Sequence, residues 1–214
     1  MMFEETSVSW AENIRLSQLA EKIFQGLYPY RKNRKVSLSK NVPAINIKNI
    51  VDGRIDVDAP CLISVDSRRN LEKHTVRSGD VVVTCRGTVL KSAVVPESLD
   101  GYLIASNIIA IRLNSNFEPI LLSAFFQSPE GQKILLSNVR SSTMQIALAV
   151  SDIEKIEVPL IPAEIQKRLA GLVAASDNYY KAVVESANLR REIAHGIALK
   201  SFRQTSNQLE AKVE

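Results

Sequence analysis

The residues best suited to chemistry in this sequence are four clustered cations that lie beside two tyrosines. Tyr28 and Tyr30 open the cluster, and the stretch 31–54 carries seven basic residues against one acidic residue, Asp52. Guanidinium and ammonium groups pair with phosphate oxygens, and aromatic rings stack on bases or sugars. The pattern favours binding of a polyanion, although a solvated loop that only keeps the chain soluble explains the cluster equally well. The cations expected to contact phosphate are Arg31, Lys32, Arg34 and Lys35.

Sequence motifs for catalysis or metal binding are scarce. The chain has no G-x-x-x-x-G-K-[ST] phosphate loop, no G-x-G-x-x-G fingerprint and no H-E-x-x-H helix. His74 and His195 have no Cys or carboxylate at metal-ligand spacing. Asp56 and Asp58 fall on one face of an expected strand, but the carboxylate-x-Lys triplet that a nuclease commonly adds follows only in the tail. We therefore expect no catalytic residue and no metal ligand in this chain.

Composition places the chain among ordinary globular proteins. Of its 214 residues 23% are charged and 45% hydrophobic, which excludes collagen-like, disordered and disulfide-stapled classes. Cys61 and Cys85 form no C-x-x-C motif and are expected to be reduced thiols. No run approaches the roughly 20 apolar residues of a membrane span, and the first residues carry acid where a signal peptide is basic. We expect a cytoplasmic protein without a membrane partner.

A run bracketed by prolines, residues 159–162, separates two kinds of sequence. Before it, short β-branched or alternating segments are separated by turn signals such as Asp52-Gly53. The fold class is therefore α+β: a mixed α/β domain with short strands over residues 1–161, followed by a long coiled-coil-type helix in residues 162–214. Within the first domain we expect strands at 44–50, 81–85, 103–105 and 108–113, and helices at 119–126 and from 128 onward.

The second part predicts a helix with an apolar seam. No proline follows residue 162, and apolar residues recur with four-three spacing before a shift of phase near residue 189. A helix from Ala163 to about Phe202 would be roughly 60 Å long, which is longer than such a domain is wide. Part of the seam must then pack on another helix or subunit, unless the helix folds back as a hairpin at Gly196. The expected interface residues are Ile165, Leu169, Leu172, Tyr179, Val183, Leu189, Ile193 and Ile197.

Five segments occur in the order found in a known family. They are Trp10 with the strand, short helix and glycine of 15–26; the strand and turn of 42–53; the Gly79-Asp80 turn with the apolar strand and Arg86-Gly87-Thr88; the strand of 104–111; and 141–145 continuing through 158–166. Together they resemble the specificity subunit of type I restriction–modification systems. Two departures are visible: the family usually has two recognition domains and two spacer helices, and Pro-x-x-Glu-Gln is commoner than the sequence of residues 162–166.

This resemblance implies a role for each part. Residues 1–161 would be a target-recognition domain that reads a few base pairs of duplex DNA. Residues 162–214 would be the spacer helix that docks methyltransferase subunits, with the restriction subunit as a further partner. A homodimer through the helix would restore two recognition domains and make the target palindromic, because two-fold symmetry gives both halves one sequence. The chain itself would need no cofactor, since S-adenosylmethionine, Mg²⁺ and ATP would serve the partner subunits.

Reading of bases needs side chains that satisfy base edges with two hydrogen bonds, Arg for guanine and Asn or Gln for adenine. For Arg86 and Asn107 an equally good interpretation is that they fix loops through backbone hydrogen bonds. Residue type and loop placement select Arg68, Arg69, Arg86, Asn107, Arg140 and Gln145 as candidates.

The first hypothesis is thus a non-catalytic DNA-recognition subunit. The alternative is a truncated specificity fragment that docks on the methyltransferase through its helix without reading DNA, and salt-dependent DNA binding separates the two. An autonomous nuclease is disfavoured by the carboxylates available.

Overall fold

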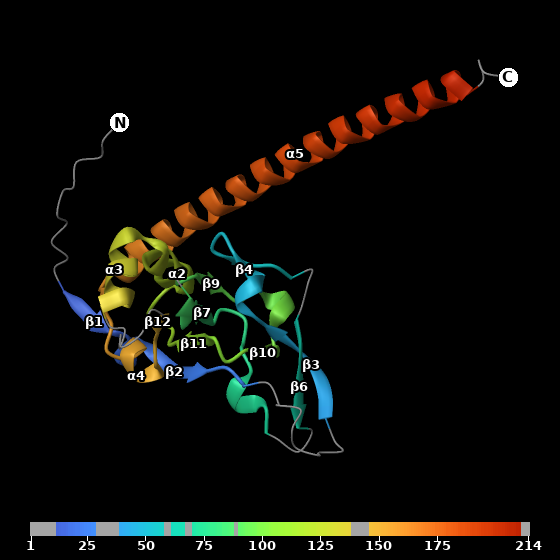
Figure 1. Cartoon of the computed structure of the whole chain (residues 1–214). Helices are drawn as coiled ribbons and strands as arrows, with labels where there is room; N and C mark the ends of the chain where they lie inside the picture. Colours follow the sequence, from blue (N-terminus) through green and yellow to red (C-terminus); the bar gives the residue numbers. More distant parts are fainter. Residues whose placement is uncertain are drawn as a thin grey trace. The chain divides into compact units, whose positions relative to one another are not determined.

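The computed structural model describes residues 12–28, 39–57, 61–66, 70–87, 90–137 and 146–210 (Figure 1). The chain divides into two compact units, Met1–Ala170 and Gly171–Glu214. The elements in chain order are β1 (Asn13–Arg15), α1 (Leu16–Leu19), β2 (Ala20–Gln25), β3 (Ser39–Ile45), β4 (Ile50–Val51), β5 (Arg54–Ile55), β6 (Cys61–Asp66), β7 (Val81–Thr84), β8 (Arg86–Gly87), β9 (Ser92–Val94), β10 (Leu103–Ile104), β11 (Ile108–Leu113), α2 (Pro119–Gln127), α3 (Pro129–Ser137), β12 (Ile146–Ala147), α4 (Val150–Ile153), β13 (Glu157–Pro159) and α5 (Ala163–Glu210), with 3₁₀ turns at Ile47–Asn49, Glu72–His74 and Glu97–Leu99. The predicted α+β class, short strands followed by a long helix, is confirmed.

A four-stranded antiparallel sheet, ordered β2-β11-β7-β9, lies at the centre of the first unit. All of β7 is buried, because both faces of this sheet are covered. Val82 and Ala93 face one apolar cluster, which also holds residues from β3, β4 and β10. Ser92 points to the opposite face and donates a hydrogen bond to Ser123 of α2 at 3.2 Å. Helix α2 therefore covers that second face, against β7 and β9 (Figure 1).

A smaller sheet, ordered β10-β3-β6, packs beside the first one around a second apolar cluster. The two sheets approach closely at Gly26, whose neighbour Leu27 bridges to Ala105. A Cβ atom on Gly26 would overlap the backbone carbonyl groups of Ile104 and Ala105. Only glycine therefore fits where the chain leaves β2.

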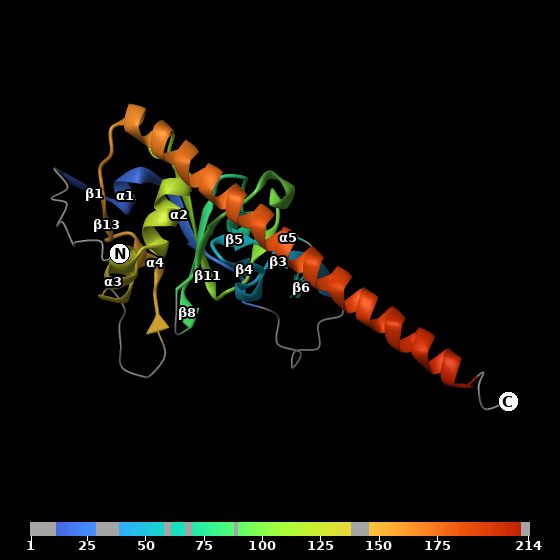
Figure 2. The ribbon, with the colours of Figure 1, turned by 90° about the horizontal axis from the view of Figure 1, so that it is seen from above.

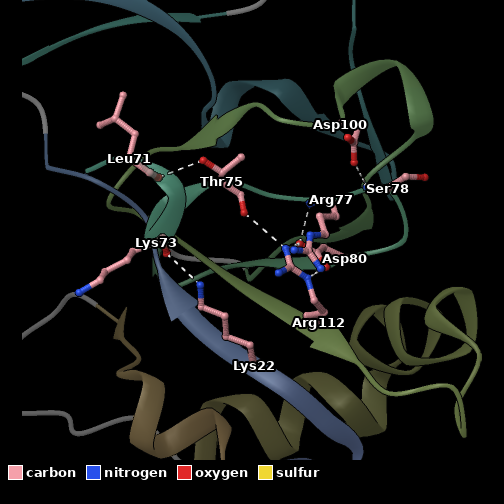
Figure 3. Close-up of polar contacts among 9 residues, drawn as sticks. All are labelled: Lys22, Leu71, Lys73, Thr75, Arg77, Ser78, Asp80, Asp100 and Arg112. Carbon is pink, nitrogen blue, oxygen red and sulfur yellow. Dashed lines mark hydrogen bonds and ion pairs between the residues drawn. The ribbon is translucent and has the colours of Figure 1, made fainter. Parts of the chain in front are cut away.

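A buried ion pair fixes the turn that opens β7 (Figure 3). Gly79 adopts φ +85°, a region that favours glycine. The carboxylate of Asp80 accepts from the Arg77 backbone N–H at 2.8 Å and from Nη2 of Arg112 on β11 at 2.7 Å. The hydrogen bond to Asp80 raises the pKa of the Arg112 guanidinium, so Arg112 stays charged. Arg112 also donates to the Thr75 carbonyl oxygen at 3.4 Å. This bond joins β11 to the segment that precedes the turn.

The structure corrects the prediction of a single strand over residues 44–50. β3 ends at Ile45, because Asn46 Oδ1 accepts from the Ile47 backbone N–H at 2.6 Å and Asn46 N–H donates to Asn49 Oδ1 at 2.9 Å. These local bonds turn the chain into a 3₁₀ turn before β4. The strand expected to carry Asp56 ends one residue earlier, at Ile55, and Asp58 lies outside the described residues.

Helix α5 runs without a break from Ala163 to Glu210 and passes through Gly196, so the hairpin alternative is wrong (Figure 2). It extends beyond the expected end near Phe202, since no Gly or Pro follows to stop it. All eight predicted interface residues are exposed in this single chain, from 37% for Leu169 to 74% for Tyr179.

The first turns of α5 are anchored by Gln166, whose side chain is 3% exposed. Its Oε1 accepts from the Glu118 backbone N–H at 2.8 Å, while Nε2 donates to the carbonyl oxygens of Ile161 at 2.8 Å and Asn116 at 3.1 Å. These three hydrogen bonds, which we call the Gln166 clasp, explain why the first compact unit includes the start of the helix. That residues 1–161 and 162–214 act as separate domains stays a prediction.

We expect Gly26→Ala to lower the free energy of unfolding by about 3 kcal/mol or more, since the added methyl group meets backbone atoms that cannot move aside. Urea denaturation followed by circular dichroism measures the change. Gly171→Ala is the control, because its Cβ meets nothing within 4 Å and alanine favours a helix by about 0.5–1 kcal/mol. Equal stability of the Gly26 variant and the wild type would contradict the close approach.

We expect Gln166→Ala to cost about 1–3 kcal/mol, because it removes a buried side chain and leaves part-buried backbone groups of Asn116, Glu118 and Ile161 without their partner. The same denaturation experiment tests it. Its exposed neighbour gives the control, Lys167→Ala, which should change stability by less than about 0.5 kcal/mol. A similar effect of both substitutions would show that the clasp contributes nothing specific.

Candidate nucleic-acid interface

Two strands of the central sheet end at the same edge. β2 and β7 both pair antiparallel with β11, so they run in the same direction, and their last residues Gln25 and Thr84 lie opposite Ile109 and Ile108. Beyond these ends the chain leads to Tyr28 and to Arg86. We call this edge the strand-end site and define it as residues 25–28, 84–87 and the turn 105–107.

The interior of the strand-end site is held by hydrogen bonds to the turn 105–107. Gln25 Nε2 donates to the Ser106 carbonyl oxygen at 2.8 Å, and the Cys85 backbone N–H donates to the Asn107 carbonyl oxygen at 2.9 Å. The Asn107 side chain donates to Asn46 Oδ1 at 3.3 Å. Burial raises the pKa of the Cys85 thiol, so at neutral pH it is a protonated packing group and not a nucleophile.

The outer part of the site is formed by an exposed pair. Arg86 Nη2 donates to the Tyr28 hydroxyl at 3.0 Å, and the guanidinium carbon lies 6.0 Å from the centre of the tyrosine ring. Both side chains are exposed, Tyr28 to 55%. Among the described residues no carboxylate forms an ion pair with Arg86. The pair therefore offers unneutralised positive charge beside an aromatic ring.

Two segments that carry predicted cations join the described chain at this site. Segment 29–38 follows Tyr28, and segment 138–145 precedes Ile146, which pairs with Gly87 between β12 and β8. At its other end, segment 29–38 leads into Ser39, which pairs with Asp66 directly before segment 67–69. The predicted site residues of these segments lie outside the described residues: Arg31, Lys32, Arg34, Lys35, Arg68, Arg69, Arg140 and Gln145.

Of the candidates for base contacts, Arg86 and Asn107 are described, and the structure brings both to the strand-end site. Their environments differ, since Arg86 is exposed and Asn107 is half-buried with its amide donated to Asn46. Sequence reasoning missed Gln25 and Asn46 as groups that hold the turn. It also missed the link between Tyr28 and Arg86, for which the signal was the common direction of β2 and β7 and not any local motif.

Other chemistry finds little support in the part of the chain that the structure describes. There, no three His, Cys, Asp or Glu side chains gather as a metal site would need. His74 Nδ1 is hydrogen-bonded to the Gln25 carbonyl oxygen at 2.9 Å, which gives it a structural role. No helix in the same ranges is apolar over enough of its length to cross a bilayer. A groove of about 680 Å³ lies at the root of α5, but Gln166, its buried polar residue, is fully used by the clasp.

Known proteins are similar to this chain in sequence and in fold. Residues 8–182 match the family model of the type I restriction modification DNA specificity domain. The type I restriction enzyme EcoKI specificity subunit of Escherichia coli K12 is 25% identical over 171 residues, which is 75% of this chain and 36% of the relative. The crystal structure of the HsdS subunit from Thermoanaerobacter tengcongensis aligns with a TM-score of 0.54 at 18% identity, over 82% of this chain and 39% of that one. The type I S subunit from M. genitalium gives 0.52 at 11% identity, over 89% and 45%.

The chain spans less than half the length of each of these relatives. At such identities the solved structures show a shared fold, whereas the family follows from the sequence match. Because that match extends over residues 8–182, well beyond half of the sequence, the chain belongs to the family of type I restriction–modification DNA specificity domains.

Proposed function

We propose that this chain is a non-catalytic DNA-recognition subunit of a type I restriction–modification complex in the cytoplasm. It reads one half of a bipartite duplex target, and a homodimer reads both halves. Methyltransferase subunits dock on it and supply the chemistry with S-adenosylmethionine, while Mg²⁺ and ATP serve a restriction subunit. The observation that carries the proposal is the strand-end site, where the exposed guanidinium of Arg86 has no acidic partner among the described residues.

The strand-end site suits nucleic acid because no described carboxylate neutralises Arg86 and because its backbone is fixed. Arginine forms paired hydrogen bonds with guanine or phosphate. An arginine that extends from a rigid backbone is well placed to read a base. In this proposal Arg31, Lys32, Arg34 and Lys35 contact phosphate and set the affinity. Asn107 fixes the turn, since its side-chain nitrogen donates to Asn46 and its backbone carbonyl group accepts from the Cys85 N–H.

Base contacts are the second part of the proposal. Arg86 reads a base. The other residues proposed to read bases belong to segments that adjoin the described strands, and they are Arg68, Arg69, Arg140 and Gln145.

The exposed seam of α5 supports the homodimer and the docking of the methyltransferase. Leu172 and Ile193 are 67% and 54% exposed in the single chain, although such residues are normally covered. A 48-residue helix is about 72 Å long, and packing on a partner stabilises such a helix more than intrinsic propensity does. A second copy offers the same seam and would bury it.

The same seam also fits the second candidate, a fragment that docks on the methyltransferase without reading DNA. Affinity for the methyltransferase combined with no salt-dependent DNA binding would favour this candidate.

We expect deletion of the gene to abolish adenine methylation at one bipartite motif in the host genome, because the methyltransferase would lose its reader. Base-resolution methylation maps of the host with and without the gene measure this, and re-supply of the wild-type gene should restore the motif. Unchanged motifs would favour the docking fragment. A motif with unlike halves would exclude the homodimer, since two-fold symmetry requires equal halves.

We expect Leu172→Asp to convert the dimer to a monomer at micromolar concentration in sedimentation experiments, because it places a charge in the apolar seam at both copies. Leu199→Asp is the matched control. Leu199 is 60% exposed, and at about 3.6 residues per turn it lies on the other side of the helix. Dissociation by both variants, or by neither, would contradict the seam.

A further inference from the structure

The pairing of Tyr28 with Arg86 joins two residues that are far apart in the sequence but meet at the strand-end site. A surface arginine ordinarily moves among many rotamers, which costs free energy whenever a ligand orders it. Here the Tyr28 hydroxyl accepts from one guanidinium nitrogen at 3.0 Å. The tyrosine thereby restricts the arginine before any ligand arrives.

Both partners stand on fixed backbone. On the tyrosine side, the Gly26 N–H donates to the Ile108 carbonyl oxygen at 3.0 Å and the Leu27 N–H donates to that of Ile104 at 2.8 Å. On the arginine side, Cys85 is held by both of its backbone groups, to Asn107 at 2.9 Å and to Leu148 at 3.0 Å. The sheet therefore fixes the backbone from which each side chain extends, and the hydroxyl restricts the guanidinium itself.

A fixed direction of the guanidinium matters more for a contact with a base than for a contact with a phosphate. A phosphate accepts hydrogen bonds from many directions, and a mobile lysine or arginine serves it well. The O6 and N7 acceptors of guanine lie in one plane and require a guanidinium held in that plane. The remaining N–H donors of Arg86 have no acidic partner among the described residues and can make this contact.

Resting on the proposed function, we propose that Tyr28 is a positioning residue for specificity: its hydroxyl orients Arg86 for a two-point contact with one guanine of the target. Tyr28 itself need not touch DNA. The loss of its hydroxyl alone should then relax the same single position in each half of the recognised sequence, because both copies of the homodimer carry the change, and leave the other positions unchanged.

The test uses methylation maps of the host that carries the full chain as wild type, Tyr28→Phe, Arg86→Lys or Tyr180→Phe. Tyr180 is the matched control, a tyrosine on α5 that is 52% exposed. The wild-type map gives the motif and hence the duplexes for competition binding, one cognate and one set with each guanine replaced.

Arg86→Lys keeps the charge and loses the fork, so discrimination at one guanine should fall by roughly 5- to 150-fold. Tyr28→Phe should lower discrimination at the same guanine by about 3- to 10-fold. Arg86→Lys combined with Tyr28→Phe should discriminate no worse than Arg86→Lys alone, because the hydroxyl acts only through the guanidinium. Tyr180→Phe should change no position.

Two results would overturn the inference while the proposed function stands. One is an unchanged sequence preference of Tyr28→Phe. The other is an equal loss of affinity for every duplex with a smaller dependence on salt, which marks a phosphate contact. If the wild type itself supports no methylated motif, the proposed function fails first.

Discussion

The register between β11 and its two neighbours is the constraint on which the rest of the first unit depends. Residues 108–111 are buried on both faces, so a shift of one residue would exchange the two sets of side chains and take Ile108 and Ala110 out of their apolar cluster. The ion pair between Asp80 and Arg112 fixes the start of β7 on β11. At the far end of these strands, Tyr28 and Arg86 meet because both neighbours of β11 run in the same direction. The strand-end site is thus a product of sheet geometry.

Polar side chains in the interior of the first unit form their hydrogen bonds within that unit. Gln25 and Gln166 are hydrogen-bonded to the backbone of another segment, and Asp80 to the Arg77 backbone N–H of its own turn. Each holds a turn or a helix start in place. Such groups have little capacity left for a ligand, whereas the predicted cations lie in segments that connect framework strands. Loops on a rigid framework are the usual place for recognition, since their sequence can change without loss of the core.

The sequence predicted those parts of the structure that are encoded by strong local patterns. The β-branched run at 81–85, the strand at 108–113 and the helices that begin at Pro119 and Pro129 were correct to within a residue or two. The prediction of a strand at residues 46–49 was wrong, because Asn46 forms local hydrogen bonds that compete with strand pairing. A pattern of alternating apolar and polar residues does not reveal such bonds. The bond between Tyr28 and Arg86 could not be predicted either, since it depends on the register of β11 with two other strands.

The two units differ in how their stability arises. The first unit buries two apolar clusters of its own, and the strand-end site is therefore formed before any partner binds. The second unit is a length of α5 whose large apolar residues, from Leu172 to Phe202, are mostly exposed in the single chain. An isolated helix gains little from propensity alone, so the association that we propose would also stabilise the helix. In the function that we propose, recognition of a base would then belong to a preformed surface, whereas assembly would decide the placing of two such surfaces on one target.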